Sequence, residues 1–356
     1  MAHARTILYL CVVLATLVIS KSTPQKTIKL SSGHEIPVVG LGTWQMPSEA
    51  IDVAVTSALE SGYRHIDTAF TYGNEEAIGK ALKKWFDKGN KRQDLFITTK
   101  LPPIGMRGSL VEAYLKLSLE KLNLEYVDLY LIHKPFAFVK DKYKHQPALN
   151  EDGSVVLDLD TDHLDIWKAM EKQVKAGRCR SIGLSNFNRT QLLNVYDHAE
   201  IKPSNLQIEL QAYNQQREMR EVCSLRNIAI TAFSTLGSPG SSSDKRTRIY
   251  KSLPKLLDNP KVKRIADAHN KTTAQVLLRH ATQAGIIVLP KSTHPDRIRQ
   301  NIGIFDFELT DDEVKLMNGL DKGEQGRIFH FFIDKGVEKH PQYPFATQLK
   351  NEKKTE

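Results

Sequence analysis

Four side chains of this sequence could carry out acid–base chemistry, and each lies in or just past an apolar run. Asp67 belongs to the run HIDTA, Tyr72 stands five residues later, Lys100 ends LFITTK and His133 follows VDLYLI. A carboxylate inside an apolar strand is unfavourable unless a cation pairs with it. Lys100 can supply that cation if the two runs form neighbouring strands, and Tyr72 then holds its phenol over the same pair.

Each of these residues also has a purely structural explanation. A single Asp–Lys pair is common in protein cores, and a single histidine after an apolar strand is more often a hydrogen-bonded core residue than a catalyst. Four such groups at or just past strand ends favour a functional site. The expected strand ends carry further polar, aromatic and glycine residues, namely Gly42, Thr43, Trp44, Ser185, Asn186, Gln207, Phe233, Ser234, Lys291 and Ser292.

The chain after residue 26 alternates short β-type runs with amphipathic segments. Apolar residues recur at i, i+3 and i+4, which is typical of helices, in the segments 49–61, 75–87, 110–122, 164–176 and 273–283. The expected strands are 36–44, 65–69, 95–101, 127–135, 181–187, 206–213, 228–237 and 286–292. Eight strands alternating with helices predict an α/β fold, a closed (β/α)8 TIM barrel whose chemistry lies at the C-terminal strand ends.

Two further features bear on this architecture. The segment TIKLSSGHEIPVV has a Ser32-Gly33 turn between two short β runs, which predicts an N-terminal β-hairpin that could plug the bottom of the barrel. The competing fold is a doubly wound sheet that binds a dinucleotide at a G-x-G-x-x-G turn. The sequence VGLGTW supplies Gly40 and Gly42 but no third glycine, which favours the barrel.

The composition is that of an ordinary globular protein. The 356 residues are 40% hydrophobic and 26% charged, enough for one large α/β domain or two smaller ones. The formal net charge is +9, but lysine and arginine alternate with acidic residues along the chain. We therefore interpret the charge as a solvated basic surface and expect no nucleic-acid partner.

The N-terminal residues 1–23 differ from the rest of the chain. Arg5 precedes a mostly apolar run over residues 7–19, and small polar residues follow it. The run is short for a bilayer span and is typical of a secretory signal peptide. We expect cleavage near residues 20–23 and no stable membrane association afterwards, and an uncleaved signal anchor is the alternative.

Sequons and cysteines agree with a secretory route. Asn188 and Asn270 each begin an N-glycosylation triplet, which is consistent with a secreted glycoprotein. Loss of Cys11 with the signal leaves Cys179 and Cys223, too few for a disulfide framework in a chain of this length. We expect these two cysteines to be buried free thiols.

Seven motifs occur in an order and spacing typical of one family: GLGTW, HIDTAFTYGNEEAIGKAL, LFITTKL, VDLYLIHKP, SIGLSNF, LQIELQAY and LPKSTHPDRIRQN. They resemble the motifs of the aldo-keto reductases, and FDFELTDDEVKLMNGLD with HPQYPF resembles the family's C-terminal segment. The likeness covers about residues 27–346. We therefore expect a signal peptide at 1–23, one aldo-keto reductase barrel with a C-terminal substrate loop at 24–346, and a polar tail at 347–356.

The resemblance implies an NADPH-dependent reductase that transfers hydride to an aldehyde or ketone to give an alcohol. Tyr72 resembles the family's general acid, which protonates the carbonyl oxygen. A free phenol has a pKa of about 10, and Lys100, held by Asp67, would favour the phenolate and ease proton release. His133 resembles the histidine that hydrogen-bonds and orients the substrate carbonyl.

The resemblance also implies a binding site for the nicotinamide of NADPH. Ser185, Asn186 and Gln207 resemble the polar groups that hold its carboxamide. Phe233 stands where relatives usually have a tyrosine that stacks on the ring, and it keeps the aromatic face. The other residues expected in this part of the cofactor site are Thr43, Asp67, Ser234, Leu236 and Ser238, the last three from a loop that folds over the pyrophosphate.

The far end of the cofactor has its own expected contacts. Lys291, Ser292 and Arg297 resemble the group that binds the 2′-phosphate, and Asn301 resembles an adenine contact. A pair of cations forms strong, charge-assisted hydrogen bonds with a phosphate, so we expect the site to bind NADPH more tightly than NADH. No metal ion is expected.

Two positions depart from the family pattern. Lys134 stands where many relatives have tryptophan, and Leu210-Gln211-Ala212 stands where they often read Cys-His-Pro. Lys134 would favour polar or anionic substrates if it faces the pocket, and would have no effect if it points outward. The expected substrate contacts are Trp44, Tyr72, His133 and Lys134.

The long segments 136–160 and 326–345 would decide the substrate. They carry Phe136, Phe138, Phe329, Phe331 and Phe332, and aromatic residues in such connections often line pockets. A surface-packing role stays open for half of them. A partly apolar small-molecule carbonyl substrate and a monomeric enzyme are expected. Two alternatives stay open, a secreted 3-dehydroecdysone (ketosteroid) reductase and a non-catalytic NADPH-binding family member; the four intact catalytic-type residues argue against the second.

Overall fold

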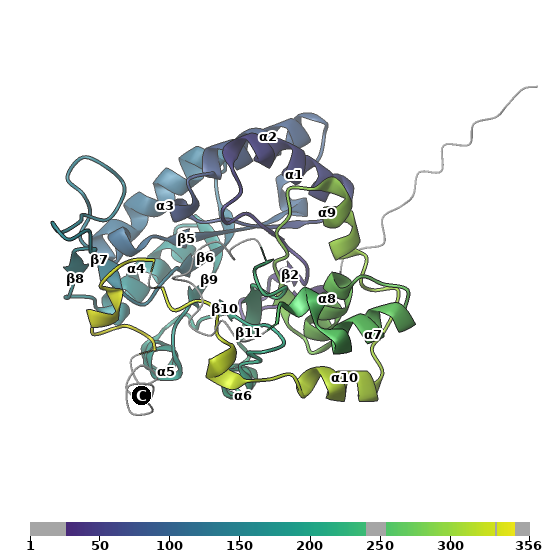
Figure 1. The fold of residues 1–356 in the computed structure, drawn as a ribbon. Helices are drawn as coiled ribbons and strands as arrows, with labels where there is room; N and C mark the ends of the chain where they lie inside the picture. The colour runs from purple at the N-terminus through teal and green to yellow at the C-terminus, as the bar shows by residue number, and fades with distance from the viewer. Residues whose placement is uncertain (1–25, 240–253, 332, 346–356) are drawn as a thin grey trace, which may run out of the picture.

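Parallel strands form the centre of the molecule, with helices around them (Figure 1). The fold is described from a computed structural model, which places residues 26–239, 254–331 and 333–345; the expected signal peptide and polar tail lie outside this range. The strands follow one another in the sheet in chain order: β3 (Leu41–Gly42), β4 (His65–Asp67), β5 (Phe96–Leu101), β6 (Val127–Ile132), β9 (Cys179–Ser185), β10 (Asn205–Glu209), β11 (Ala229–Phe233) and β12 (Ile287–Val288).

Backbone hydrogen bonds join the first strand to the last and close the barrel. Gly40 N donates to Val288 O, and Val288 N donates to Val38 O, each over 2.9 Å. The eight parallel strands and the surrounding helices confirm the predicted (β/α)8 fold.

The helices surround the strands, and α1, α2 and α3 lie side by side along one side of the barrel (Figure 1). Their apolar faces pack on the sheet, as Ile78 and Leu82 of α2 do. The helices are α1 (Ser48–Glu60), α2 (Glu75–Asp87), α3 (Gly108–Leu122), α4 (His163–Lys175), α5 (Arg189–His198), α6 (Arg217–Ser224), α7 (Pro260–Ala268), α8 (Thr273–Gln283), α9 (Pro295–Ile302) and α10 (Asp311–Asn318). The five helical segments named from the sequence agree with these bounds to within two residues.

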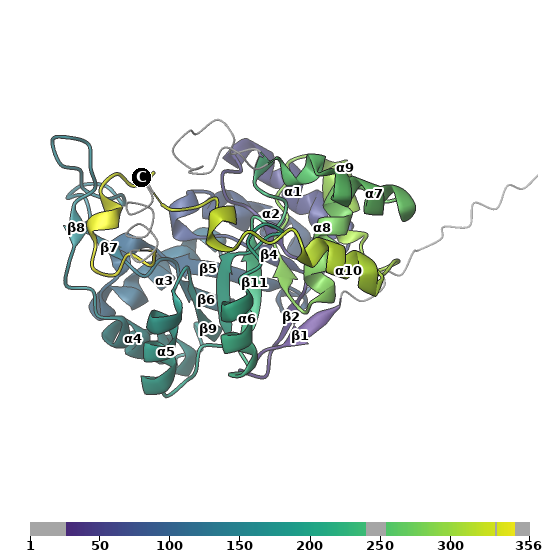
Figure 2. The ribbon, with the colours of Figure 1, turned by 60° about the horizontal axis from the view of Figure 1, so that its bottom comes forward.

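The predicted hairpin is present and covers the bottom of the barrel. Strands β1 (Thr27–Lys29) and β2 (Glu35–Pro37) pair in antiparallel fashion around Gly33, whose φ of +88° favours glycine. Leu30 and Ile36 pack with residues from the barrel strands in one apolar cluster. Figure 2 shows the hairpin at the end of the barrel opposite the C-terminal segment, which is drawn in yellow.

The predicted strands were too long in most cases. The apolar run 36–44 is divided between the hairpin strand β2 and the barrel strand β3. The runs 206–213 and 228–237 leave the sheet at Glu209 and Phe233. Ser234 has a φ of +59°, which no strand accommodates, although the apolar pattern continues past it.

The two long connections contact each other beside the barrel. The segment after β6 forms a small antiparallel pair, β7 (Ala137–Phe138) with β8 (Leu157–Asp158), and Val155 N donates to Lys335 O of the C-terminal segment over 3.0 Å. Phe136 and Phe138 are 0% and 3% exposed and belong to the hydrophobic core. These two rings therefore have the packing role that the sequence left open for half of these aromatic residues.

Two other expectations concern cysteines and membranes. Cys179 and Cys223 are buried free thiols, as predicted. Over the residues that the structure places, none of the helices combines the length and the apolar character that a bilayer span requires.

Candidate active site

Lys100 and Asp67 form a buried ion pair between neighbouring strands. Strands β4 and β5 run parallel, and the Lys100 side chain is fully buried. Its Nζ donates to Asp67 Oδ1 over 2.6 Å, to Thr68 O over 2.8 Å and to Tyr72 Oη over 3.3 Å. These bonds use all three donors of an ammonium group. The pairing predicted from the sequence is confirmed.

Tyr72 lies on a short 3-10 turn, Phe70–Tyr72, that follows β4. Its phenolic oxygen accepts from Lys100, so its own hydrogen is left to point at another acceptor. Burial raises the pKa of Tyr72 well above its ordinary value, and Asp67 adds to the shift. Burial therefore outweighs the expected stabilisation of the phenolate by Lys100, and the phenol is protonated at neutral pH, the form that can donate a proton.

His133 lies beside Tyr72, just past the end of β6. The two ring centroids are 5.5 Å apart in an edge-on arrangement, and His133 Nδ1 lies 3.2 Å from Thr71 Oγ1. Burial, with the positive charges of Lys100 and Lys134, holds the pKa of His133 well below its ordinary range. The imidazole is therefore neutral at pH 7 and can donate one N–H. Thr71 was not expected from the sequence, because nothing in FTY marks it.

Two of the expected cofactor residues, Gln207 and Asn186, are hydrogen-bonded to this group, and a third, Ser185, is hydrogen-bonded to Asn186. Gln207 Nε2 donates to Asp67 Oδ2 over 2.8 Å, so both carboxylate oxygens of Asp67 have partners. Asn186 Nδ2 donates to His133 O over 2.8 Å and to Ser185 Oγ over 3.0 Å. These amides therefore lie at the edge of the Asp67, Tyr72, Lys100 and His133 cluster, named below the catalytic cluster.

An aromatic group lines the rim of the same end of the barrel. Phe329 of the C-terminal segment contacts Trp44 and Phe233 edge-on, with ring centroids 5.4 and 5.8 Å away. Trp44 is 37% exposed and so is available to a ligand. Thr43 is fully buried, and its hydroxyl donates to the backbone oxygen of Asp67 over 2.9 Å.

Exposed cations gather after β12, at the start of α9. Lys291 and Arg297 are exposed, and among the residues placed by the structure neither forms an ion pair. Ser292 and Asn301 are buried, and Ser292 Oγ accepts from His294 N over 3.1 Å. The N-terminus of a helix with two free cations is suited to a phosphate group.

The loop after β11 carries the other expected cofactor residues. Ser238 Oγ donates to Ser234 Oγ over 2.8 Å, and both residues have left-handed backbones, with φ of +47° and +59°. Leu236 is half-buried against the core. Residues 240–253, which come next in the sequence, lie outside the described range.

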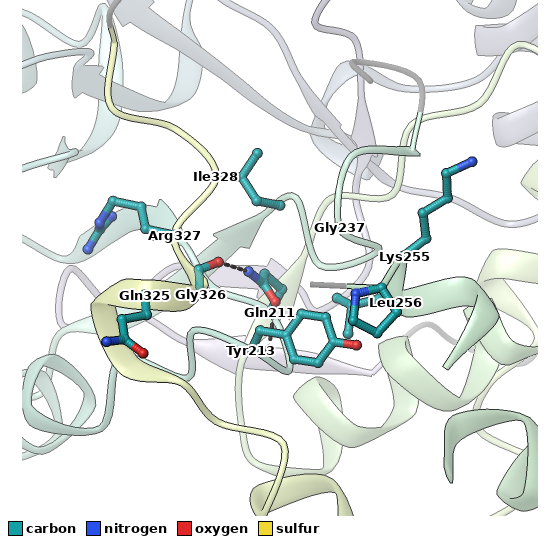
Figure 3. A pocket seen from close by; sticks show the side chains of 10 residues that line it. Gln211, Tyr213, Gly237, Lys255, Leu256, Gln325, Gly326, Arg327 and Ile328 are labelled. Carbon is teal, nitrogen blue, oxygen red and sulfur yellow. Dashed lines mark hydrogen bonds between the residues drawn. The ribbon is translucent and has the colours of Figure 1, made fainter. Parts of the chain in front are cut away.

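Gln211, one of the positions that departs from the family pattern, ties the C-terminal segment to the barrel (Figure 3). Its Nε2 donates to Gly326 O over 2.7 Å, and its Oε1 accepts from Tyr213 N over 2.7 Å. These residues border a cavity of about 30 Å³, with Gly237 on its other side. That volume holds no more than about one water molecule.

Lys134 does not present a free charge to a substrate. Its Nζ lies 2.7 Å from Asp334 Oδ2 of the C-terminal segment, and the two side chains are only 17% and 22% exposed. The ammonium also lies 5.4 Å from the Phe136 ring centre and 5.1 Å from that of Phe331. The structure therefore gives Lys134 a role in holding the segment; Phe332 lies outside the described range.

Glu209 holds the same segment and was missed by the sequence reasoning. It is 1% exposed, and its carboxylate accepts from the backbone N–H groups of Ile328 and Phe329 over 2.8 Å each. Burial raises the pKa of Glu209, while Arg327 and these two N–H groups oppose the shift. Only its place, two residues after Gln207, could have indicated it.

Comparisons with known proteins agree with this geometry. The sequence profile described as "Aldo/keto reductase family" matches residues 38–322. The chain belongs to this family. Aldo-keto reductase family 1 member A1 of Xenopus tropicalis is 42% identical over 323 residues, which cover 89% of this chain and 96% of that protein. The NAD(P)H-dependent D-xylose reductase I,II of Candida tropicalis is 42% identical over 301 residues, 83% and 93% of the two chains.

A solved structure is similar throughout. The aldose reductase of Schistosoma japonicum superposes with a TM-score of 0.81 at 39% identity, covering 90% of this chain and 99% of that one. The family assignment, the barrel and the catalytic cluster are therefore mutually consistent. The protein is an oxidoreductase, an aldo-keto reductase.

Proposed function

We propose that this aldo-keto reductase reduces an aldehyde or ketone to an alcohol with NADPH, and that Tyr72 is its general acid. The observation that carries the proposal is the bond from Lys100 to the Tyr72 oxygen, which leaves the phenolic hydrogen for a substrate. Neutral phenol and neutral imidazole on one rim can both donate to a carbonyl oxygen. An acceptor placed between Tyr72 and His133 would receive two hydrogen bonds.

The residues at the strand ends fit NADPH. The exposed cations Lys291 and Arg297 suit a 2′-phosphate, and the amides of Asn186 and Gln207 suit a carboxamide. Bound NADPH would supply the hydride. The xylose reductase among the relatives is named as NAD(P)H-dependent, which supports a nicotinamide cofactor here.

The chain's own residues act on charge and protons. His133 orients the carbonyl and begins to stabilise negative charge on its oxygen. Tyr72 then gives its proton to that oxygen, and negative charge moves onto the phenol. Lys100, 3.3 Å from the phenolic oxygen and held by Asp67, stabilises this charge only as it forms, which lowers the barrier instead of tightening ground-state binding.

The rim favours a partly apolar carbonyl compound. Trp44, Phe233 and Phe329 meet edge-to-face at the mouth, whereas the Lys134 charge is taken up by Asp334. The signal-like N-terminus and the exposed sequon Asn270 support a secreted enzyme.

Loss of the near-ultraviolet absorbance of NADPH on addition of a carbonyl panel tests the function. The panel should include aromatic and aliphatic aldehydes, sugars and ketosteroids. We expect faster consumption with apolar and aromatic carbonyls than with anionic ones. NADPH binding without consumption by any member would support a non-catalytic binding protein instead.

A further inference from the structure

Three buried polar atoms lie on the helix side of strand β5. They are Glu75 Oε2 at the start of α2, Ser118 Oγ in α3 and Tyr130 Oη in β6. The three groups are neighbours: Thr99 is the register partner of Tyr130 and donates to Glu75, and a side-chain hydrogen bond with Ser118 lowers the pKa of Glu75. Tyr130 Oη has no hydrogen-bond partner among the described residues. Buried polar atoms are almost always hydrogen-bonded, and an internal water usually has two to four polar partners.

Glu75 also reaches the strand that carries the catalytic lysine. Thr99 Oγ1 donates to Glu75 Oε1 over 2.6 Å. Thr99 and Lys100 are consecutive in β5, so their side chains point to opposite faces of the sheet. Lys100 faces Asp67 and Tyr72 inside the barrel, and Thr99 faces the helices. Glu75 therefore lies on the face of β5 opposite to the Lys100 side chain. In the sequence it is three residues after Tyr72.

The negative charge of Glu75 favours the protonated form of Lys100. Glu75 is 1% exposed and forms no ion pair within the described residues. Asp67 and Glu75 both stabilise the Lys100 ammonium, against the burial that lowers its pKa. Burial raises the pKa of Glu75. The other titratable groups near Glu75 and Tyr130 are Lys121 and Tyr114 of α3 and Cys179 of β9.

We propose that Glu75 is a positioning residue for the reduction. Glu75 fixes the start of α2 against β5 by its hydrogen bond with Thr99 and by one internal water that it shares with Ser118 and Tyr130. The turn that carries Tyr72 directly precedes α2, so Glu75 also fixes the position of that turn. Its carboxylate supports the Lys100 ammonium from the side opposite Asp67. This inference rests on the proposed carbonyl reduction.

The substitution Glu75→Gln tests the charge, because the amide keeps the shape and an acceptor for Thr99. Without the carboxylate, both the Lys100 ammonium and the neutral Tyr72 phenol are less favoured. The alkaline limb of the kcat/KM profile should therefore move to lower pH, by about half to one pH unit. Glu76→Gln is the matched control, because Glu76 is the next residue and pairs with Lys80 on the surface, 70% exposed; its profile should coincide with that of the unsubstituted enzyme.

A second variant separates charge from position. Glu75→Asp keeps the carboxylate but shortens the reach to Thr99, so we expect the original alkaline limb with a several-fold lower kcat. An unchanged limb in Glu75→Gln, or an equal loss at every pH, overturns the charge role. If Glu75→Gln does not fold, the kcat of Glu75→Asp tests the proposal by itself. An unchanged kcat in Glu75→Asp overturns the positioning role.

A crystal structure at high resolution tests the water directly. One ordered water within hydrogen-bond distance of Glu75, Ser118 and Tyr130 is expected, and an empty site overturns that part. An active unsubstituted enzyme with unaltered Glu75 variants would refute only this inference. Failure of the unsubstituted enzyme to reduce any carbonyl would refute the proposed function as well.

Discussion

Lys100 donates one of its three N–H groups to the oxygen of Tyr72 over 3.3 Å, while the other two go to Asp67 and to Thr68 O. The hydrogen bonds to Asp67 and Thr68 O thus fix the ammonium group, and its third N–H points at the phenol. A cation fixed beside a neutral phenol gains energy when that phenol loses its proton. In the proposed reduction, this relationship would make Tyr72 a better acid in the transition state without ionising it beforehand.

The cofactor preference can be tested at α9. Lys291→Met or Arg297→Met should raise the Kd for NADPH at least tenfold and leave NADH nearly unaffected, because a charge-assisted hydrogen bond is worth about 1.5–3 kcal/mol and only NADPH has the phosphate. Titration by fluorescence gives both constants. Arg299→Met is the control, since Arg299 lies on the same helix and pairs with Asp296 over 2.9 Å. Equal weakening of both cofactors would assign these cations to another ligand.

The ion pair between Lys134 and Asp334 should affect substrate binding through the C-terminal segment. Lys134→Met and Asp334→Asn each remove a half-buried pair worth about 1 kcal/mol, so both should change KM for apolar carbonyls in the same direction, by a few-fold. Steady-state kinetics on one apolar and one anionic aldehyde measure this. If Lys134 instead binds anionic substrates, the variants will diverge: Lys134→Met will weaken the anionic aldehyde and Asp334→Asn will strengthen it.

His65 should make the fold sensitive to acid. Its ring is buried, with Nδ1 3.2 Å from Pro37 O and Nε2 3.2 Å from Thr98 Oγ1, and burial lowers its pKa from 6.5 to about 4. The unfolded chain therefore binds the extra proton first as pH falls. The stability from neutral His65 is complete above pH 6.5 and is lost between pH 6.5 and 4, on the order of 3 kcal/mol.

Urea unfolding at pH 7 and pH 4 checks this expectation. His65→Asn should reduce the fall in unfolding free energy between the two values, whereas the exposed His198→Asn should not. An unaltered fall in His65→Asn would show that other groups cause the acid sensitivity.

Glycosylation should distinguish the two sequons. Asn188 caps α5, and its Nδ2, the atom that a glycan would occupy, donates to Pro344 O over 3.2 Å. Asn270 is exposed between α7 and α8. Product from a eukaryotic secretory host should begin near residues 20–24 and lose mass on glycosidase treatment, and Asn270→Gln but not Asn188→Gln should abolish that loss. An unglycosylated intracellular product that retains Met1 would refute the secretory reading.

The catalytic cluster was accessible from the sequence because burial leaves a charged strand residue few choices. Asp67 in an apolar run required a cation, and Lys100 was the one at a neighbouring strand end. The C-terminal contacts were not accessible in this way. Lys134 and Asp334 are 200 residues apart, and irregular segments have no periodicity that predicts such contacts.

Other features could not be predicted from the sequence for a different reason: they depend on how distant parts of the chain pack together. The run 36–44 reads as one strand, yet it serves both the hairpin and the barrel. A Cβ at Gly40 would lie 2.6 Å from the His65 ring, so packing, not phosphate binding, requires this glycine. Likewise the pair Glu75-Glu76 marks a helix start, but only the fold reveals that one carboxylate is buried and the other is exposed.

The most direct test of the account is turnover by Tyr72→Phe, with Tyr143→Phe, an 83% exposed tyrosine, as the control. Phenylalanine keeps the ring and removes the proton donor. With NADPH and the best carbonyl substrate, kcat should fall by about 10²-fold to 10⁴-fold while the Kd for NADPH stays nearly the same. A Tyr72→Phe enzyme that keeps most of its turnover would contradict the assignment of Tyr72 as the general acid.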